Sequence, residues 1–170
     1  MSLKTPWRRL ALTAAASALS LAAATQAWAN SLTAVTNAGN WTFVGAALQI
    51  VPGTTTALFA NPANQRFIVT FSAECAVNAP AGNSIAWTDV DIVVLRNNVV
   101  VSTLQPTVGP NGAFCAANGT AGFDGWESNS ITAVGGAGLP AGFYQVQVRA
   151  RLNGGATGGW FGERATVVYR

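Results

Sequence analysis

Residues 66–77, RFIVTFSAECAV, constrain the fold most strongly because their apolar side chains fall on every second position. Successive side chains of a β-strand point to opposite faces, so alternate positions share one face. Six residues share the predicted inward face: Phe67, Val69, Phe71, Ala73, Cys75 and Val77. Thr70, Ser72 and Glu74 lie on the other face. This pattern predicts a central strand with one face in a core and the other nearer water.

The rest of the chain indicates an all-β fold. After residue 29 no long stretch has helical periodicity, and turn-forming residues recur at short intervals. Two further long strands are predicted over residues 84–96 and 143–152, and Asn97-Asn98 predicts a two-residue hairpin that leads into a strand over 99–104. Shorter strands are expected at residues 32–35, 41–44, 48–51, 54–60, 131–134 and 165–169.

Two connections complete the expected architecture. Residues 106–125 are rich in Gly, Pro and Asn and predict a long crossing connection, and the Gly-rich residues 153–159 predict a hairpin loop. So many strands favour a two-sheet antiparallel β-sandwich. A jelly roll is favoured over an immunoglobulin-like fold, because Trp87 follows Cys75 closely and no Tyr stands two residues before Cys115.

Residues 1–29 are typical of a secretory signal peptide. Lys4, Arg8 and Arg9 form a basic start, an uncharged Ala-rich run follows, and residues 27–29 (AWA) fit the cleavage pattern. We therefore expect one domain over residues 30–170, exported by a bacterium to the periplasm or the medium, with no membrane anchor. Without residues 1–29 the chain has six arginines, six acids and no lysine, so no basic surface for nucleic acid is predicted.

Cys75 and Cys115 are the two cysteines of the chain. In an exported protein two cysteines are expected to form a disulfide. Closing the long loop between them stabilises the fold by about 4 kcal/mol in the chain-entropy treatment. Because Cys75 lies on the inward face of the central strand, the bond is expected to tie the long connection to the core.

Residues 138–152, GLPAGFYQVQVRARL, are followed by a Gly-rich loop, Trp160 and a final apolar strand. This ending resembles the last hairpin of bacterial jelly-roll domains similar to those of the complement C1q and tumour-necrosis-factor type. The resemblance covers roughly the last fifth of the chain. It implies a non-catalytic domain that often assembles into trimers.

The residues that are missing exclude several kinds of active site. The chain has no histidine, and its single lysine, Lys4, lies before residue 30. Ser-His-Asp and Cys-His catalysis, histidine-ligated zinc and lysine nucleophiles are therefore excluded from the domain. We expect no enzymatic activity and no cofactor, with Ca²⁺ as the one metal that the remaining oxygen ligands suit.

Asp89 and Asp91 are the candidate metal ligands. They lie two positions apart on a predicted strand, about 7 Å along it and on one face. Such a pair can bind Ca²⁺ together with loop carbonyls, or act as acid and base in glycoside hydrolysis. The alternative is a solvated strand end paired with arginine, and Glu74 is likewise interpreted as an outward or arginine-paired acid.

Trp126 and Trp160 are the candidate ligand-binding residues, because both stand in Gly-rich stretches where exposure is expected. Exposed indoles can stack on sugars or anchor a protein interface. The alternative is that they cap the ends of the sandwich core.

Three functional hypotheses follow. The chain is 50% hydrophobic and 9% charged, which favours a self-assembly or protein-binding module that forms homo-oligomers through apolar sheet faces. The alternative is a carbohydrate-binding, lectin-like module that uses Trp126, Trp160 and Ca²⁺ near Asp89 and Asp91. A glycoside hydrolase that depends on these two carboxylates is the remaining reading.

Overall fold

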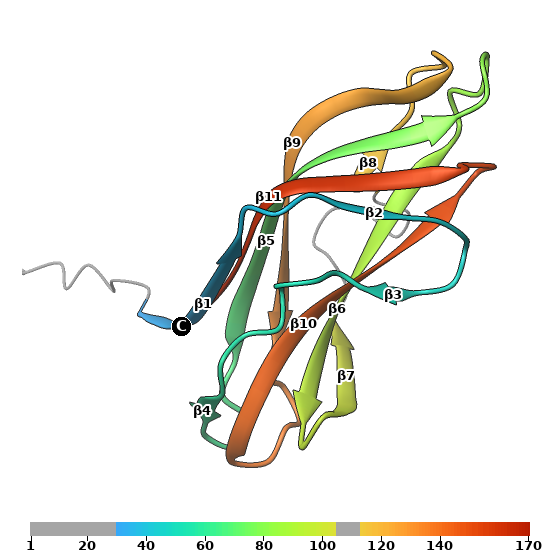
Figure 1. Ribbon diagram of the computed structural model, residues 1–170. Helices are drawn as coiled ribbons and strands as arrows, with labels where there is room; N and C mark the ends of the chain where they lie inside the picture. Colours follow the sequence, from blue (N-terminus) through green and yellow to red (C-terminus); the bar gives the residue numbers. More distant parts are fainter. Residues whose placement is uncertain (1–29, 105–112) are drawn as a thin grey trace, which may run out of the picture.

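The computed structural model describes residues 30–104 and 113–170 (Figure 1). Its first sheet contains five strands: β1 (Ser31–Asn37), β2 (Trp41–Phe43), β5 (Phe67–Ala79), β9 (Gly122–Gly135) and β11 (Gly158–Tyr169). The strand order is β1-β11-β5-β9, and β2 pairs with β11. The predicted signal peptide lies outside the described residues.

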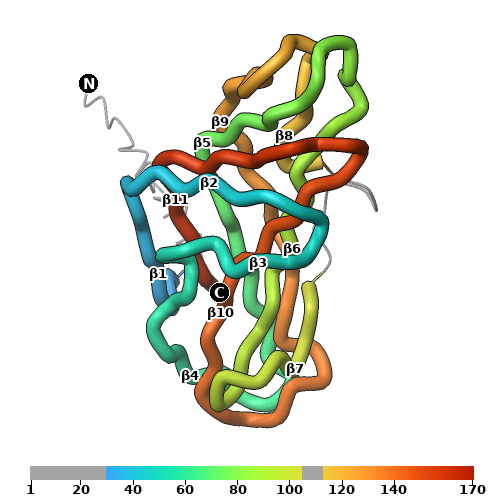
Figure 2. The backbone as a smooth tube through the Cα atoms, turned by 45° about the vertical axis from the view of Figure 1, so that its right-hand side comes forward, coloured from blue at the N-terminus to red at the C-terminus, as the bar shows by residue number. Residues whose placement is uncertain are grey.

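The second sheet contains six strands: β3 (Gln49–Ile50), β4 (Phe59–Asn61), β6 (Trp87–Arg96), β7 (Val99–Leu104), β8 (Cys115–Ala116) and β10 (Gly142–Asn153). Its order is β3-β10-β6-β7, with β4 on β10 and β8 on β6. Every strand pair in both sheets is antiparallel. Figure 2 shows β5 and β11 in one layer and β6 and β10 in the other. The predicted all-β, two-sheet antiparallel sandwich is confirmed, whereas the choice of a jelly roll stays a prediction.

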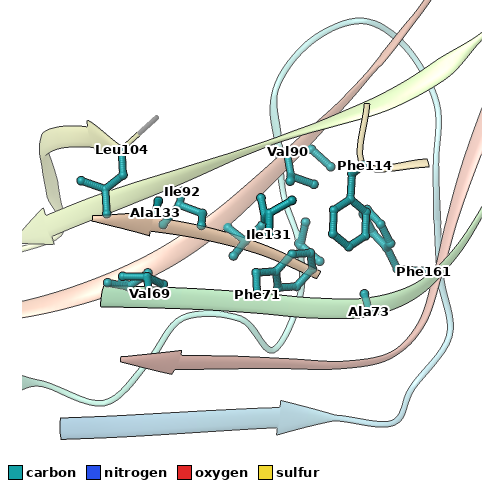
Figure 3. Packing of buried hydrophobic residues seen from close by; sticks show 14 of the residues in the cluster. Val69, Phe71, Ala73, Val90, Ile92, Leu104, Phe114, Ile131, Ala133 and Phe161 are labelled. Atoms are coloured by element: carbon teal, nitrogen blue, oxygen red, sulfur yellow. The ribbon is translucent and has the colours of Figure 1, made fainter. Parts of the chain in front are cut away.

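The core lies between the inner faces of β5, β6 and β10. All six residues that the alternation assigned to the inward face of β5 are buried. In Figure 3, Val69 and Phe71 of β5 lie on the side that faces Val90 and Ile92 of β6. Phe71 also packs against Phe114, with ring centroids 5.1 Å apart. Period-two alternation therefore located the core correctly.

The disulfide between Cys75 and Cys115 is confirmed, with Cα atoms 6.2 Å apart. Cys75 belongs to β5 in the first sheet, and Cys115 belongs to β8, which pairs with β6 in the second. The bond therefore joins the two layers at one end of the sandwich.

The Asn97-Asn98 hairpin is also confirmed. Asn97 and Asn98 have φ angles of 53° and 62°, and β7 returns antiparallel to β6. Positive φ at both central residues is what a tight hairpin turn requires, and Asn adopts it more easily than most residues.

Three predicted boundaries are wrong. The strand expected over 131–134 is the end of the 14-residue β9, and the one over 165–169 is the end of the 12-residue β11. The connection expected over 106–125 contains β8 and the start of β9, while residues 105–112 lie outside the described residues. Glycines such as Gly125 and Gly159 suggested loops, but they lie within strands, where β-bulges and close packing require them.

The strand predicted over 54–60 is also wrong, since β4 covers just Phe59–Asn61. Thr54 and Thr56 lie alongside β10 and are buried. Their hydroxyls accept hydrogen bonds from the backbone N–H groups of Val148, at 3.2 Å, and Val146, at 3.0 Å. The threonine hydroxyls thus accept from the edge of β10, while the backbone N–H of Thr56 donates to the carbonyl of Val146 at 2.9 Å.

Residues 153–159 do not form the predicted hairpin loop. β10 pairs with β3, β4 and β6, whereas β11 pairs with β1, β2 and β5, so the connection crosses from one sheet to the other. Gly154 and Gly155 take positive φ angles of 62° and 80° in this crossing. A Gly-rich link shows that the chain turns, but it does not show which strand the chain meets afterwards.

Neither described range contains a helix, so this part of the chain holds no helical segment that could cross a membrane.

Candidate ligand groove

Two β-bulges flank the middle of β5 on its outer face. Between the pairs Phe161–Cys75 and Arg164–Ala73, β11 has two residues where β5 has one, Glu74. Bulges bend a strand and change the direction of its side chains, and they are frequent beside binding sites.

The second bulge lies on the other side of β5, in β9. Here Gly125 and Trp126 stand opposite the single residue Ala76. Gly125 has a φ of 62°, the left-handed conformation that glycine adopts without strain. The local register of both neighbours of β5 therefore changes within three residues, around Glu74 and Ala76.

These bulges bring Trp126 and Trp160 together. The two ring centroids are 4.8 Å apart, and the rings meet edge to face with an interplanar angle of 62°. Trp160 is directly opposite Ala76 in the register, and Ala76 is just 1% exposed although it lies on the outer face. The small alanine side chain leaves room for the two indoles to meet above β5.

The two tryptophans differ in exposure. Trp126 is 61% exposed, whereas Trp160 is half-buried. The indole N–H of Trp126 donates to the carbonyl of Phe123 at 3.2 Å, which fixes the ring while its surface stays in solvent. Trp126 therefore does not cap the core, and the core-capping alternative does not hold for it.

A surface pocket of about 360 Å³ lies beside the tryptophan pair. Besides the two indoles it is lined by Glu74, Glu127 and Ser128 and by Cys75 of the disulfide. A second hollow of about 570 Å³ shares Glu74 and Ser128 with it and extends across β5 toward β1. We call the two hollows together the outer groove. It presents an aromatic end and a long polar end on one sheet face.

The polar end of the outer groove is built from short side chains. Its lining includes Thr36, Asn37, Ser72, Asn129 and Ser130. The Ser72 hydroxyl donates to the hydroxyl of Ser130 across the strands at 3.0 Å, which leaves other hydrogen-bonding capacity of both groups free for a ligand.

Gly162 is required at the junction between the two ends. A Cβ atom at this position would overlap the indole of Trp160 and the carboxylate of Glu74. The absence of a side chain lets the indole and the carboxylate approach each other over the bulge of β11.

Three carboxylates border the outer groove: Glu74, Glu127 and Glu163. All three are exposed, and Glu74 Oε2 accepts one weak hydrogen bond from the backbone N–H of Glu163, at 3.4 Å. In residues 30–104 and 113–170 the one ion pair joins Arg151 of β10 to Asp89 of β6, in the other sheet. Glu74 is therefore outward, as one of its two interpretations predicted, but it has no arginine partner in the described part of the chain.

Arg164 also lines the outer groove, but its charge is directed into the protein. The guanidinium is buried and donates to the carbonyls of Pro52, Gly39 and Gly162 at 2.8, 2.5 and 2.8 Å. Burial lowers the pKa of Arg164 from its usual value. This residue ties the β11 bulge to two loops and forms no ion pair with the glutamates.

Asp89 and Asp91 lie on β6 in the other sheet, so the structure does not bring them to the tryptophans. The Asp89 carboxylate accepts hydrogen bonds from the Trp87 indole at 2.9 Å and the Asn153 amide at 2.6 Å, and it pairs with Arg151 at 3.5 Å. Asp89 thus holds the ends of β6 and β10 together, in line with the arginine-paired alternative, and the calcium site stays a prediction.

Within the described ranges, one group of three side chains could hold a metal ion by distance, and it consists of Cys75, Cys115 and Glu127. Both sulfur atoms are used in the disulfide. A thiolate is the form that binds metals, so this group is not a metal site.

Sequence reasoning selected Trp126 and Trp160 but missed the carboxylate of Glu163 and the hydroxyl of Ser128. Alternation on β5 did place Glu74 outward, and the Gly residues beside Trp126 and Trp160 marked local irregularity. No pattern in the sequence indicated that β9 and β11 flank β5, which is what collects these side chains on one face.

No protein-family model and no curated protein sequence matches this chain.

Proposed function

We propose that this protein is an exported, non-catalytic carbohydrate-binding module whose ligand lies in the outer groove. The observation that carries the proposal is the exposed indole of Trp126, held against Trp160 at the end of a polar groove. A flat aromatic surface binds the apolar face of a sugar ring, and short polar side chains beside it bind the hydroxyls.

The dimensions of the groove favour an oligosaccharide over a single sugar. The pocket beside the indoles and the polar hollow share Glu74 and Ser128, so a chain of sugar rings can occupy both. Ser72, Asn129 and Ser130 offer hydroxyl and amide groups along the polar part. A site of this kind gains specificity from several weak hydrogen bonds.

The available side chains favour binding over catalysis. The chain contains no histidine, both cysteines form the disulfide, and Asp89 of the carboxylate pair first considered for hydrolysis is engaged by Trp87 and Asn153. Export is supported by the basic, Ala-rich start of the sequence and by the disulfide, since such bonds persist in oxidising compartments.

The test is binding of the purified exported chain to a glycan array, followed by titration calorimetry with the best oligosaccharide. Trp126→Ala is expected to weaken binding at least about tenfold, or 1.4 kcal/mol, because it removes the exposed half of the aromatic surface. Phe143→Ala is the matched control, since Phe143 is an equally exposed aromatic residue on β10, outside the outer groove.

Three results would contradict the proposal. They are an array without signal, equal losses from Trp126→Ala and Phe143→Ala, and release of new reducing ends during incubation with a bound oligosaccharide. The last result would identify a hydrolase.

Self-assembly is a second candidate function, and the edge strand β7 favours it. β7 pairs with β6 alone in the described residues, and Val99, Val100 and Val101 on it are exposed. An apolar edge without charges is a template for pairing with a second copy. Light scattering on the exported chain is expected to show an oligomer, a trimer if the resemblance to jelly-roll domains holds, which Val99→Lys with Val101→Lys converts to monomer. A wild-type monomer at micromolar concentration would exclude this function.

A further inference from the structure

The charge of the outer groove narrows the class of ligand. We propose that the oligosaccharide carries a protonated amine, as an amino sugar without its acetyl group does, and that this amine lies between the Trp126–Trp160 pair and the carboxylates of Glu74 and Glu127. The inference rests on the proposed glycan site and adds the charge of its ligand.

The aromatic pair and the pocket locate the site. Trp126 and Trp160 border the same hollow of about 360 Å³ as Glu74 and Glu127. A cation near an indole face is attracted by the negative charge of the π system, and tryptophan is the most effective side chain for this purpose. The edge-to-face arrangement leaves much of the Trp126 surface available, because that residue is exposed.

The carboxylates determine the sign of the charge that this site accepts. Glu74 lies where the two hollows join, Glu127 borders the aromatic end, and Glu163 borders the polar end. Each is exposed, and in the described residues none of the three has an ion-pair partner. A uronic acid or a sulfated sugar would be repelled here, whereas an ammonium group would find the opposite charge.

The protein supplies no competing cation at this place in the described residues. The domain has no lysine, and the guanidinium of Arg164 is occupied by three backbone carbonyls beneath the groove. Ammonium groups have three donors, so one amine can reach both a carboxylate and a neighbouring oxygen such as the hydroxyl of Ser128. The ligand is therefore expected to provide the positive charge that this face lacks.

The experiment compares matched sugars. An array printed with free-amine and N-acetylated forms of the same oligosaccharides, starting from the glucosamine tetramer, is probed with the exported chain, and the best pair is titrated by calorimetry. The free-amine form is expected to bind at least about tenfold more tightly, and its affinity should fall as salt is raised, since the contact is a partly exposed charge pair.

Substitutions test which carboxylate produces the preference for the free amine. Glu74→Gln keeps the shape of the side chain but removes its negative charge, so it is expected to reduce the preference for the free amine over the acetylated form several-fold. Asp91→Asn is the matched control, because it removes one acid from the outer face of the other sheet and should leave both affinities unchanged.

The possible failures are distinguishable. If the acetylated forms bind equally or more tightly and Trp126→Ala still weakens their binding, the proposed amine contact is wrong and the proposed glycan site remains. No binding to any sugar overturns the proposed function as well. Tighter binding of a tetralysine peptide than of any free-amine sugar overturns the assignment to a carbohydrate.

Discussion

The two halves of β5 present opposite kinds of outer surface. From Phe67 to Ala73 the register with both neighbours is unbroken, and side chains bond across the strands, as Thr70 does with Thr132 at 3.2 Å and with Tyr169 at 3.0 Å. From Glu74 to Ala79 both neighbours are bulged. The side chains of the regular half thus hydrogen-bond to one another. The bulged half instead presents exposed indole and carboxylate groups.

The difference concerns the outer face of β5 and leaves its inner face unchanged. The inner face is continuous along β5, with buried residues from Phe67 to Val77. The bulges on the neighbouring strands therefore do not interrupt the core. On the outer face, one extra residue in β9 and one in β11 add the aromatic pocket beside the Ser and Thr side chains of the regular half. The proposed ligand site therefore depends on the neighbours of β5 more than on β5 itself.

The largest effect is expected from removing the disulfide, which holds the bulged half to the second sheet. Cys75→Ala with Cys115→Ala should destabilise the fold by about 4 kcal/mol, because the unfolded chain gains loop freedom. Urea unfolding measures the loss, and hydrogen exchange should increase more in residues 74–79 and 122–128 than in residues 67–73. A uniform increase along β5 would mean that its two halves form one cooperative unit.

An intermediate effect is expected from Gly162→Ala, which inserts a methyl group between Trp160 and Glu74. Overpacking should cost about 2 kcal/mol and displace the indole. Urea unfolding and the near-UV circular dichroism of the tryptophans test both effects.

Gly142→Ala is the control for that substitution. There the nearest neighbour is the flexible end of Arg96, so we expect a change of less than about 0.5 kcal/mol. Similar losses at Gly162 and Gly142 would show that the β11 bulge holds no tight contact.

The smallest effect is expected in the regular half. Thr70→Val keeps the shape of the side chain and removes its hydrogen bonds to Thr132 and Tyr169, so stability should fall by about 1 kcal/mol. Oligosaccharide binding should not change, because Thr70 does not line the outer groove. Thr36→Val, at an exposed position on β1, is the stability control. A loss of oligosaccharide affinity in Thr70→Val would show that the regular half of β5 also contributes to binding.

The sequence predicted those features that repeat along a strand or depend on residue type. Alternation identified the inner face of β5, the paired Asn97-Asn98 identified the hairpin, and the count of cysteines identified the disulfide. Alternation and the Asn-Asn turn are local signals, and two cysteines allow only one disulfide pairing.

What the sequence did not predict depends on which strands become neighbours. Gly125 and Gly162 look like loop residues because a bulge adds a single residue to a ladder and leaves no periodic pattern. Trp126 and Trp160 were selected for their Gly-rich surroundings, but their contact follows from β9 and β11 pairing with opposite edges of β5. Glu163 became a candidate through that pairing alone.

Cys75 lines the tryptophan pocket and belongs to the disulfide, so the proposed ligand site depends on the formation of that bond. A newly made chain in a reducing cytoplasm keeps both thiols free, so the layer that carries Trp126 is not yet fastened to the layer that carries β8. On the proposed export route, oxidation outside the cytoplasm would complete the pocket. The protein would then acquire its affinity at the place where it acts, and sugars inside the producing cell would meet an unfinished receptor.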